Sequence, residues 1–171
     1  DKSTDFMAIL TAVKSKNPAL LFYGGMDAQA APMVKQMKSL GLQAQFLTGD
    51  GGQTTEFMKL AGADAEGIMA SSPGLPLAKM PGGPAFQQRF EAKYGKIQNY
   101  APYPYDAVMT LVEAMQKAGS AEPGKYLPEL TKLTHAGVSG QIRFDTKGDL
   151  QGGAVTLYQV KGGQWADLQT V

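Results

Sequence analysis

Two glycine-rich turns carry the residue types in this sequence that could do chemistry. The first covers residues 24–27 as Gly-Gly-Met-Asp, and the second covers residues 48–52 as Thr-Gly-Asp-Gly-Gly. Glycine lets a backbone approach a ligand closely. A carboxylate such as that of Asp50 can pair with a cationic group, for example the ammonium of an amino acid. Glycine and aspartate also suit ordinary turns, so the residues alone leave a binding turn and a plain turn equally open.

Other reaction chemistries lack their motifs. The phosphate motifs G-x-G-x-x-G and G-x-x-x-x-G-K-[ST] are absent, as are the hydrolase motifs G-x-S-x-G and H-E-x-x-H. Cysteine is also absent, which excludes disulfides, cysteine-ligated metals and thiol catalysis. The single histidine, His135, is expected at the surface or capping a helix end. The sequence therefore predicts a protein without catalytic residues, metal or cofactor. Two carboxylates could still meet in space, which keeps an α/β enzyme as the weaker alternative.

A group of tyrosines stands out beside prolines at residues 94–105. Tyrosine offers an apolar body and a polar tip, which suits the wall of a binding pocket. We expect Tyr100 to line such a pocket. Tyr105 is expected instead to fix the start of the following helix against the core.

The elements that position the two turns alternate between helix and strand over residues 1–72. Apolar runs predict strands at 19–24, 43–49 and 67–72, and Asp27 and Thr54 can cap the helices that follow the first two. Short strands joined by helices indicate a parallel sheet covered on both faces. Ligands of such sheets bind outside the carboxyl ends of the strands, where both glycine-rich turns fall.

The rest of the chain changes character. Residues 72–84 hold four prolines and three glycines and are expected to form a linker. A helix is predicted to end near Gly95, and a longer one to run from about Pro104 to Gly119. The periodicity of the longer helix predicts a buried face made of Ala107, Val108, Leu111, Val112 and Met115. Short alternating runs near the end predict an antiparallel tail.

Bulk composition excludes some partners. The chain has 171 residues with a net charge of +1, and 43% of its residues are hydrophobic. It contains no run of Lys and Arg, so a nucleic acid is not an expected partner. It has no apolar run long enough to insert into a membrane.

Four stretches together resemble the periplasmic substrate-binding proteins of branched-chain amino-acid ABC transporters, the type I leucine/isoleucine/valine-binding proteins. They begin at DFMAILTAVK, AGADAEGIMASSP, YPYDAVMTLVEAMQKAGS and GVSGQIRFDTKGDL. The resemblance implies an α/β, bilobal fold of which this chain is only the C-terminal portion. Residues 1–72 would be βα units of the C-terminal lobe, and 73–146 a crossover with a segment of the N-terminal lobe. Residues 147–171 would return to the C-terminal lobe, with FDTKGD as the third crossover.

The resemblance also implies a function. In the periplasm, a branched-chain or similar aliphatic L-amino acid would bind between the lobes. The protein would then deliver it to a membrane permease. Asp50 would pair with the ammonium, where the family often has Glu. Gly24 and Gly25 would let the backbone come close, while Met26 and Tyr100 would contact the aliphatic chain. The family often has an aromatic residue at the position of Met26. A ligand-sensing domain, or a binder of amides or aromatic acids, remains the alternative.

Overall fold

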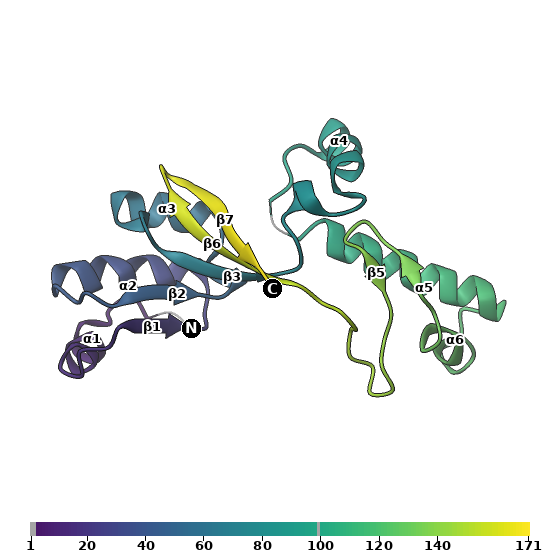
Figure 1. The fold of residues 1–171 in the computed structure, drawn as a ribbon, viewed down its shortest axis with the longest axis horizontal. Coiled ribbons are helices and arrows are strands. Elements are labelled where there is room, and N and C mark those ends of the chain that lie inside the picture. The colour runs from purple at the N-terminus through teal and green to yellow at the C-terminus, as the bar shows by residue number, and fades with distance from the viewer. Residues whose placement is uncertain (1–2, 99) are drawn as a thin grey trace. The chain divides into compact units, whose positions relative to one another are not determined.

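The chain folds into two compact units (Figure 1). The structure, a computed structural model, describes residues 3–98 and 100–171. The first unit contains Asp1–Pro73 and Val155–Val171, and the second contains Gly74–Ala154. The chain therefore re-enters the first unit at Val155 rather than at residue 147. That the units are segments of a C-terminal and an N-terminal lobe stays a prediction.

A mixed five-stranded sheet organises the first unit. Its order is β1 (Leu20–Tyr23), β2 (Gln45–Thr48), β3 (Met69–Pro73), β6 (Val155–Lys161) and β7 (Gln164–Thr170). The first three strands run parallel, and β6 and β7 are added antiparallel to β3 and to each other. The predicted parallel strands and antiparallel tail are confirmed. Because Tyr23 pairs in register with Thr48, β1 and β2 end side by side.

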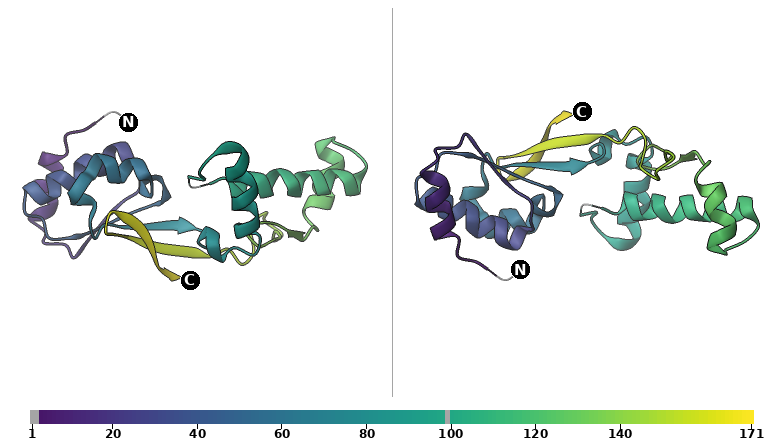
Figure 2. Two further views of the ribbon diagram at one scale, coloured as in Figure 1. Left: turned by 90° about the horizontal axis from the view of Figure 1, so that it is seen from above. Right: turned by 90° about the horizontal axis from the view of Figure 1, so that it is seen from below.

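Helices cover one face of this sheet. They are α1 (Met7–Lys14), α2 (Asp27–Ser39) and α3 (Thr55–Ala61), with short 3-10 turns η1 (Asp50–Gly52) and η2 (Gly62–Ala65). Figure 2 shows α2 and α3 on one side of β3 and β6. The core between helices and sheet contains Leu10, Val34, Met37, Phe46, Phe57, Ile68 and Val160.

The opposite face of β1 is covered only in part by the described residues. The side chains of Leu20 and Phe22 are 51% and 61% exposed, whereas Phe46 on the neighbouring strand is buried toward the helices. The expectation that both faces of the sheet are covered is therefore wrong for this strand. The pattern of β1 is continuously apolar because both of its faces are suited to burial.

The second unit is mostly helical. It contains η3 (Leu77–Lys79), α4 (Gly83–Tyr94), α5 (Pro102–Ala118) and α6 (Pro123–Leu130), and a two-stranded ladder of β4 (His135–Ala136) and β5 (Gln141–Ile142). Gly95 and Gly119 end α4 and α5 with positive φ angles of 81° and 60°, conformations that glycine adopts without a steric penalty. Both predicted helix ends are confirmed.

The buried face of α5 differs from the prediction. The buried residues are Pro102, Asp106, Thr110 and Ala114. The expected face of Ala107, Val108, Leu111, Val112 and Met115 is wrong, and Val108 is 57% exposed. The reason is a polar anchor. The Asp106 carboxylate accepts hydrogen bonds from the backbone N–H of Val138 (2.7 Å), the backbone N–H of Ser139 (2.8 Å) and the Ser139 hydroxyl (2.6 Å).

The segment FDTKGD forms a closed turn inside the second unit. The Asp145 carboxylate accepts hydrogen bonds from the backbone N–H groups of Lys147 (2.8 Å) and Asp149 (2.9 Å), and Phe144 bridges to Leu150. The two chain passages between the units run instead at Gly74 and Ala154, where the Gly74 N–H donates to the Ala154 carbonyl at 2.7 Å. That FDTKGD belongs to the third crossover between the lobes stays a prediction.

Candidate functional site

The first glycine-rich turn links the end of β1 to the start of α2. Met26 is the N-cap residue of α2, and Asp27 is the first residue inside the helix, so the prediction that Asp27 caps it is wrong by one position. A Cβ at Gly25 would overlap the ring of Tyr23, so a larger residue here would require the Tyr23 side chain to move. The Met26 side chain is 63% exposed and is available for contacts.

The second turn lies against the first. A Cβ at Gly51 would stand 2.7 Å from the Met26 sulfur and 2.9 Å from the Gly25 carbonyl oxygen, closer than such atoms can approach. Gly51 follows Asp50, which opens the η1 turn directly after β2. The structure thus brings Gly24, Gly25 and Met26 together with the turn that carries Asp50, at the carboxyl ends of two parallel strands.

Thr54 ties the two turns together. Its hydroxyl accepts from the Phe57 N–H at 2.9 Å, which confirms the predicted cap of α3. The same hydroxyl donates to the Asp27 carboxylate at 2.8 Å. The Thr54 carbonyl accepts from the Trp165 indole N–H at 3.1 Å. Sequence reasoning missed Trp165, because β7 lies 111 residues away along the chain and no local spacing points to it.

Asp50 offers a half-buried carboxylate in this setting. An ionised carboxylate only accepts hydrogen bonds, so it suits a cationic or N–H donor. No group of three or more His, Cys, Asp or Glu side chains in the described part of the chain could hold a metal ion. The arrangement can therefore hold a ligand through charge and backbone contact, and it contains no assembled metal centre among those residues.

Tyr100 belongs to the second unit, just ahead of α5. Its side chain is 43% exposed, and its carbonyl accepts from the Tyr103 N–H at 2.9 Å. A contact between Tyr100 and the ligand stays a prediction. Tyr105 packs on Phe86 of α4 with ring centroids 5.2 Å apart, as expected of a residue that fixes the start of α5.

His135 is neither a surface residue nor a helix cap. It lies in β4 with its side chain 15% exposed, and its Nδ1 is 2.6 Å from the Glu113 carboxylate. Lys117 approaches the other oxygen of that carboxylate at 3.1 Å. Hydrogen bonds from His135 and then Lys117 lower the pKa of Glu113 below its ordinary value of 4.5, against a smaller opposing effect of burial. This cluster joins β4 to α5 and has a structural role.

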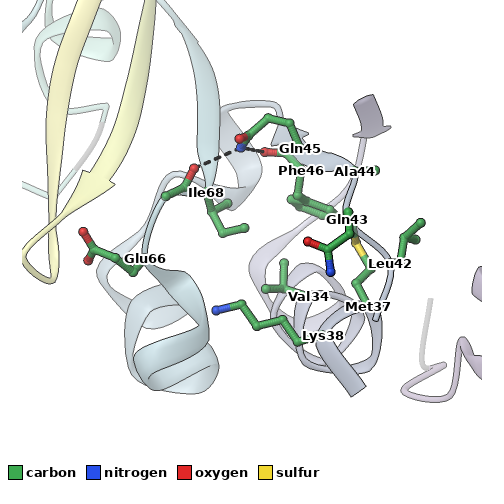
Figure 3. A pocket seen from close by; sticks show the side chains of 11 residues that line it. Val34, Met37, Lys38, Leu42, Gln43, Ala44, Gln45, Phe46, Glu66 and Ile68 are labelled. Carbon is green, nitrogen blue, oxygen red and sulfur yellow. Dashed lines mark hydrogen bonds between the residues drawn. The ribbon is translucent and has the colours of Figure 1, made fainter. Parts of the chain in front are cut away.

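A hollow of about 440 Å³ lies at the other end of the first unit's sheet, at the amino ends of β2 and β3 (Figure 3). Three of its polar side chains already have partners. Lys38 lies 3.4 Å from Asp64, Glu66 accepts from the Gly162 N–H at 3.1 Å, and Gln45 donates to the Gly67 carbonyl at 2.9 Å. The carboxyl-end turns, and not this hollow, are therefore the candidate site.

Within the described residues, no helix has the length and apolarity needed to cross a membrane.

The chain is similar to two binding proteins of Pseudomonas aeruginosa. A leucine-, isoleucine-, valine-, threonine- and alanine-binding protein of Pseudomonas aeruginosa is 30% identical over 156 residues, which are 91% of this chain and 42% of that protein. An amino acid binding protein of the same organism is 29% identical over 157 residues, with the same two shares. Both are named as binding proteins and not as enzymes.

Solved structures show the same fold. The crystal structure of a leucine-binding protein from Thermotoga maritima matches with a TM-score of 0.90 and 28% identity, covering 99% of this chain and 49% of that one. A branched-chain amino acid transporter substrate-binding protein from Streptococcus pneumoniae, solved in complex with isoleucine, matches with a TM-score of 0.83, 26% identity and the same coverage. The chain spans less than half the length of each of these relatives.

The family described as periplasmic binding protein matches residues 1–164, nearly the whole chain. The chain therefore belongs to the periplasmic binding protein family.

Proposed function

We propose that this chain forms part of the solute-binding component of an ABC importer, and that it binds an aliphatic L-amino acid. The observation that carries the proposal is the contact between the two turns. Gly51 lies against Met26 and Gly25, so the turn carrying Asp50 and the turn carrying the exposed methionine form one surface. A charged group next to an apolar side chain matches a ligand with an ammonium next to an aliphatic chain.

Each residue of this surface has a distinct part in the proposal. The Asp50 carboxylate pairs with the ligand ammonium through a charge-assisted hydrogen bond. Gly24 and Gly25 leave room for the ligand beside the backbone. Met26 contacts the aliphatic chain and, being unbranched and adaptable, tolerates side chains of several shapes. A contact of Tyr100 with the aliphatic chain is also part of the proposal.

The chain supplies only one part of the proposed site. The surface offers an acid for the ammonium, and the ligand carboxylate also needs donors. Because the chain spans 42–49% of its relatives, we place those donors in the part of the full-length gene product that corresponds to the rest of the relatives. Binding is coupled to a shift between open and closed states, which the ligand drives through its higher affinity for the closed state. The closed form then delivers the amino acid to a permease from an extracytoplasmic, periplasmic location, without catalysis.

A thermal-shift screen of the full-length gene product against aliphatic L-amino acids tests the proposal. A ligand at about 100 times its Kd adds roughly 2.7 kcal/mol of stability, a shift of several degrees. Asp50→Asn should abolish most of that shift, because the amide carries no charge to pair with the ammonium. Asp64→Asn is the matched control, since Asp64 pairs with Lys38 in the same unit, away from the turns.

The outcomes separate the two parts of the proposal. A shift that Asp50→Asn leaves intact would remove Asp50 from the site while keeping the amino-acid ligand. No shift with any amino acid would overturn the ligand class, and amides and aromatic acids would be screened next.

A further inference from the structure

Asp27 makes a contact that its position in the helix does not require. It opens α2, and one carboxylate oxygen accepts from the Ala28 N–H at 2.8 Å within the same turn. The other oxygen reaches out of the helix and accepts the Thr54 hydroxyl at 2.8 Å. A hydrogen bond to an ionised group is stronger than one between neutral groups. The start of α2 is thus fastened to the start of α3.

Thr54 passes this connection on to the C-terminal hairpin. Its carbonyl accepts the indole N–H of Trp165 at 3.1 Å, and the indole ring packs against Phe57 with centroids 5.8 Å apart. Trp165 is the only tryptophan in the chain, and it is held in β7 by pairing with Val160. The series Asp27–Thr54–Trp165 therefore joins α2, α3 and β7 behind the two glycine-rich turns.

The residues at both ends of the turns are thereby held in place. Met26 directly precedes Asp27, and Asp50 lies in the η1 turn that leads to Thr54. Glycine-rich segments lose much conformational freedom when they become ordered. A turn that is ordered before the ligand arrives spares the complex that entropic cost and binds more tightly.

We propose that the series Asp27–Thr54–Trp165 positions the two turns for ligand binding, and that the Trp165 indole N–H senses whether the site is occupied. The inference rests on the proposed amino-acid function and adds three positioning residues, none of which needs to touch the ligand. Asp50 lies in the turn that leads to Thr54, and Thr54 carries the acceptor of the indole hydrogen bond, so a ligand on Asp50 changes the surroundings of the indole N–H.

The choice of variants distinguishes a role of Asp27 and Thr54 in ligand binding from a role in stability alone. Asp27→Ala breaks the link and leaves the Thr54 hydroxyl free to cap α3 through Phe57. Glu56→Ala is the matched control, because it also removes an acid from the first turn of a helix but belongs to a local pair with Lys59. Thr54→Val compared with Thr54→Ser tests the hydroxyl itself, since serine keeps both of its hydrogen bonds.

The experiment is calorimetric titration of the full-length gene product with L-leucine, together with the NMR signal of the Trp165 indole N–H, assigned by its loss in Trp165→Phe. We expect Asp27→Ala to weaken leucine affinity roughly three- to tenfold, the effect of losing the hydrogen bond to Thr54. Thr54→Val also loses the cap of α3 and should weaken the affinity at least as much. Thr54→Ser should recover most of that loss, and Glu56→Ala should bind like the parent. The indole signal should move on leucine addition in the parent.

A failure of this inference can be distinguished from a failure of the proposed function. Parent-like leucine affinity in Asp27→Ala overturns the positioning role, and an indole signal indifferent to bound leucine overturns the sensing role. Either result leaves the proposed function standing. If the parent binds no amino acid, the proposed function fails, and the inference that rests on it fails too.

Discussion

Because Gly51 has no side chain, the two turns can pack against each other. Because a Cβ there would stand 2.7 Å from the Met26 sulfur, Gly51→Ala must push Met26 or the turn aside. We expect Gly51→Ala to lower the free energy of unfolding by about 1–3 kcal/mol. Gly49→Ala is the control, because a Cβ at Gly49 meets nothing within 4 Å and its φ of −79° suits alanine. Urea unfolding measures both, and equal midpoints would contradict the close contact.

The ion cluster around Glu113 gives a pH dependence with a definite sign. His135 and Lys117 hold the pKa of Glu113 below its ordinary value of 4.5 in the folded state. Its stabilising contribution is therefore complete above that value and is lost as the pH falls through the folded-state pKa. Glu113→Gln should make the urea midpoint less sensitive to pH as the pH falls below 4.5. Glu129→Gln, which removes a second-unit glutamate outside the cluster, should leave that sensitivity as it is.

Among single residues, the sequence could predict those whose role depends on neighbours close by in the chain. The Thr54 cap depends on a residue three positions away, and the structure confirms it. Asp27 lies one position inside the helix rather than at its cap, and its carboxylate accepts from Thr54. Trp165 and the Glu113–His135 pair could not be predicted, because they depend on strands that meet other elements only in the folded chain. Asp50, Met26, Gly24, Gly25 and Tyr100 as ligand contacts stay predictions.

Among the elements, α5 shows most clearly how a buried polar group can override an apolar pattern. The Asp106 carboxylate is only 2% exposed and accepts three hydrogen bonds from the loop after β4. Asp106→Asn turns one acceptor into a donor facing N–H groups, and should cost about 1–3 kcal/mol of stability. Asp149→Asn, at an exposed turn, is the control. A variant as stable as the parent in chemical denaturation would show that Asp106 does not hold the loop.

The sequence predicted the strands correctly but not the buried face of α5. Both outcomes have the same reason. Parallel strands have continuously apolar sequences, so their positions could be predicted without knowing what covers them. The apolar pattern of α5 was equally clear, but it marks residues such as Val108, which the described residues leave 57% exposed. A hydrophobic pattern predicts that a face is suited to burial, and it does not say which part of the polypeptide buries it.

In the whole molecule, two apolar faces are exposed, one on β1 and one on α5. Phe22 and Leu20 on β1, and Val108 and Val112 on α5, are apolar and exposed, and the chain spans less than half of each relative described above. We propose that the remaining part of the full-length gene product covers both faces. Phe22→Ser should then cost about 2 kcal/mol in that protein, the value of a buried aromatic side chain.

The comparison that checks this is Leu127→Ser, which alters an exposed leucine of α6. It should change the unfolding free energy by no more than about 0.5 kcal/mol. If Phe22→Ser proves equally mild, the open face of β1 is exposed in the full-length protein as well.

The pairing of β3 with β6 has a consequence for how this polypeptide can be cut and rejoined. Pro73 and Val155 face each other in an antiparallel register, and the next residues, Gly74 and Ala154, share a hydrogen bond of 2.7 Å. The second unit is thus an insertion within what would otherwise be a simple hairpin. A short reverse turn could replace residues 74–154 without moving either strand. The first unit would then become a modular fragment with a continuous backbone, onto which other inserted domains could be grafted.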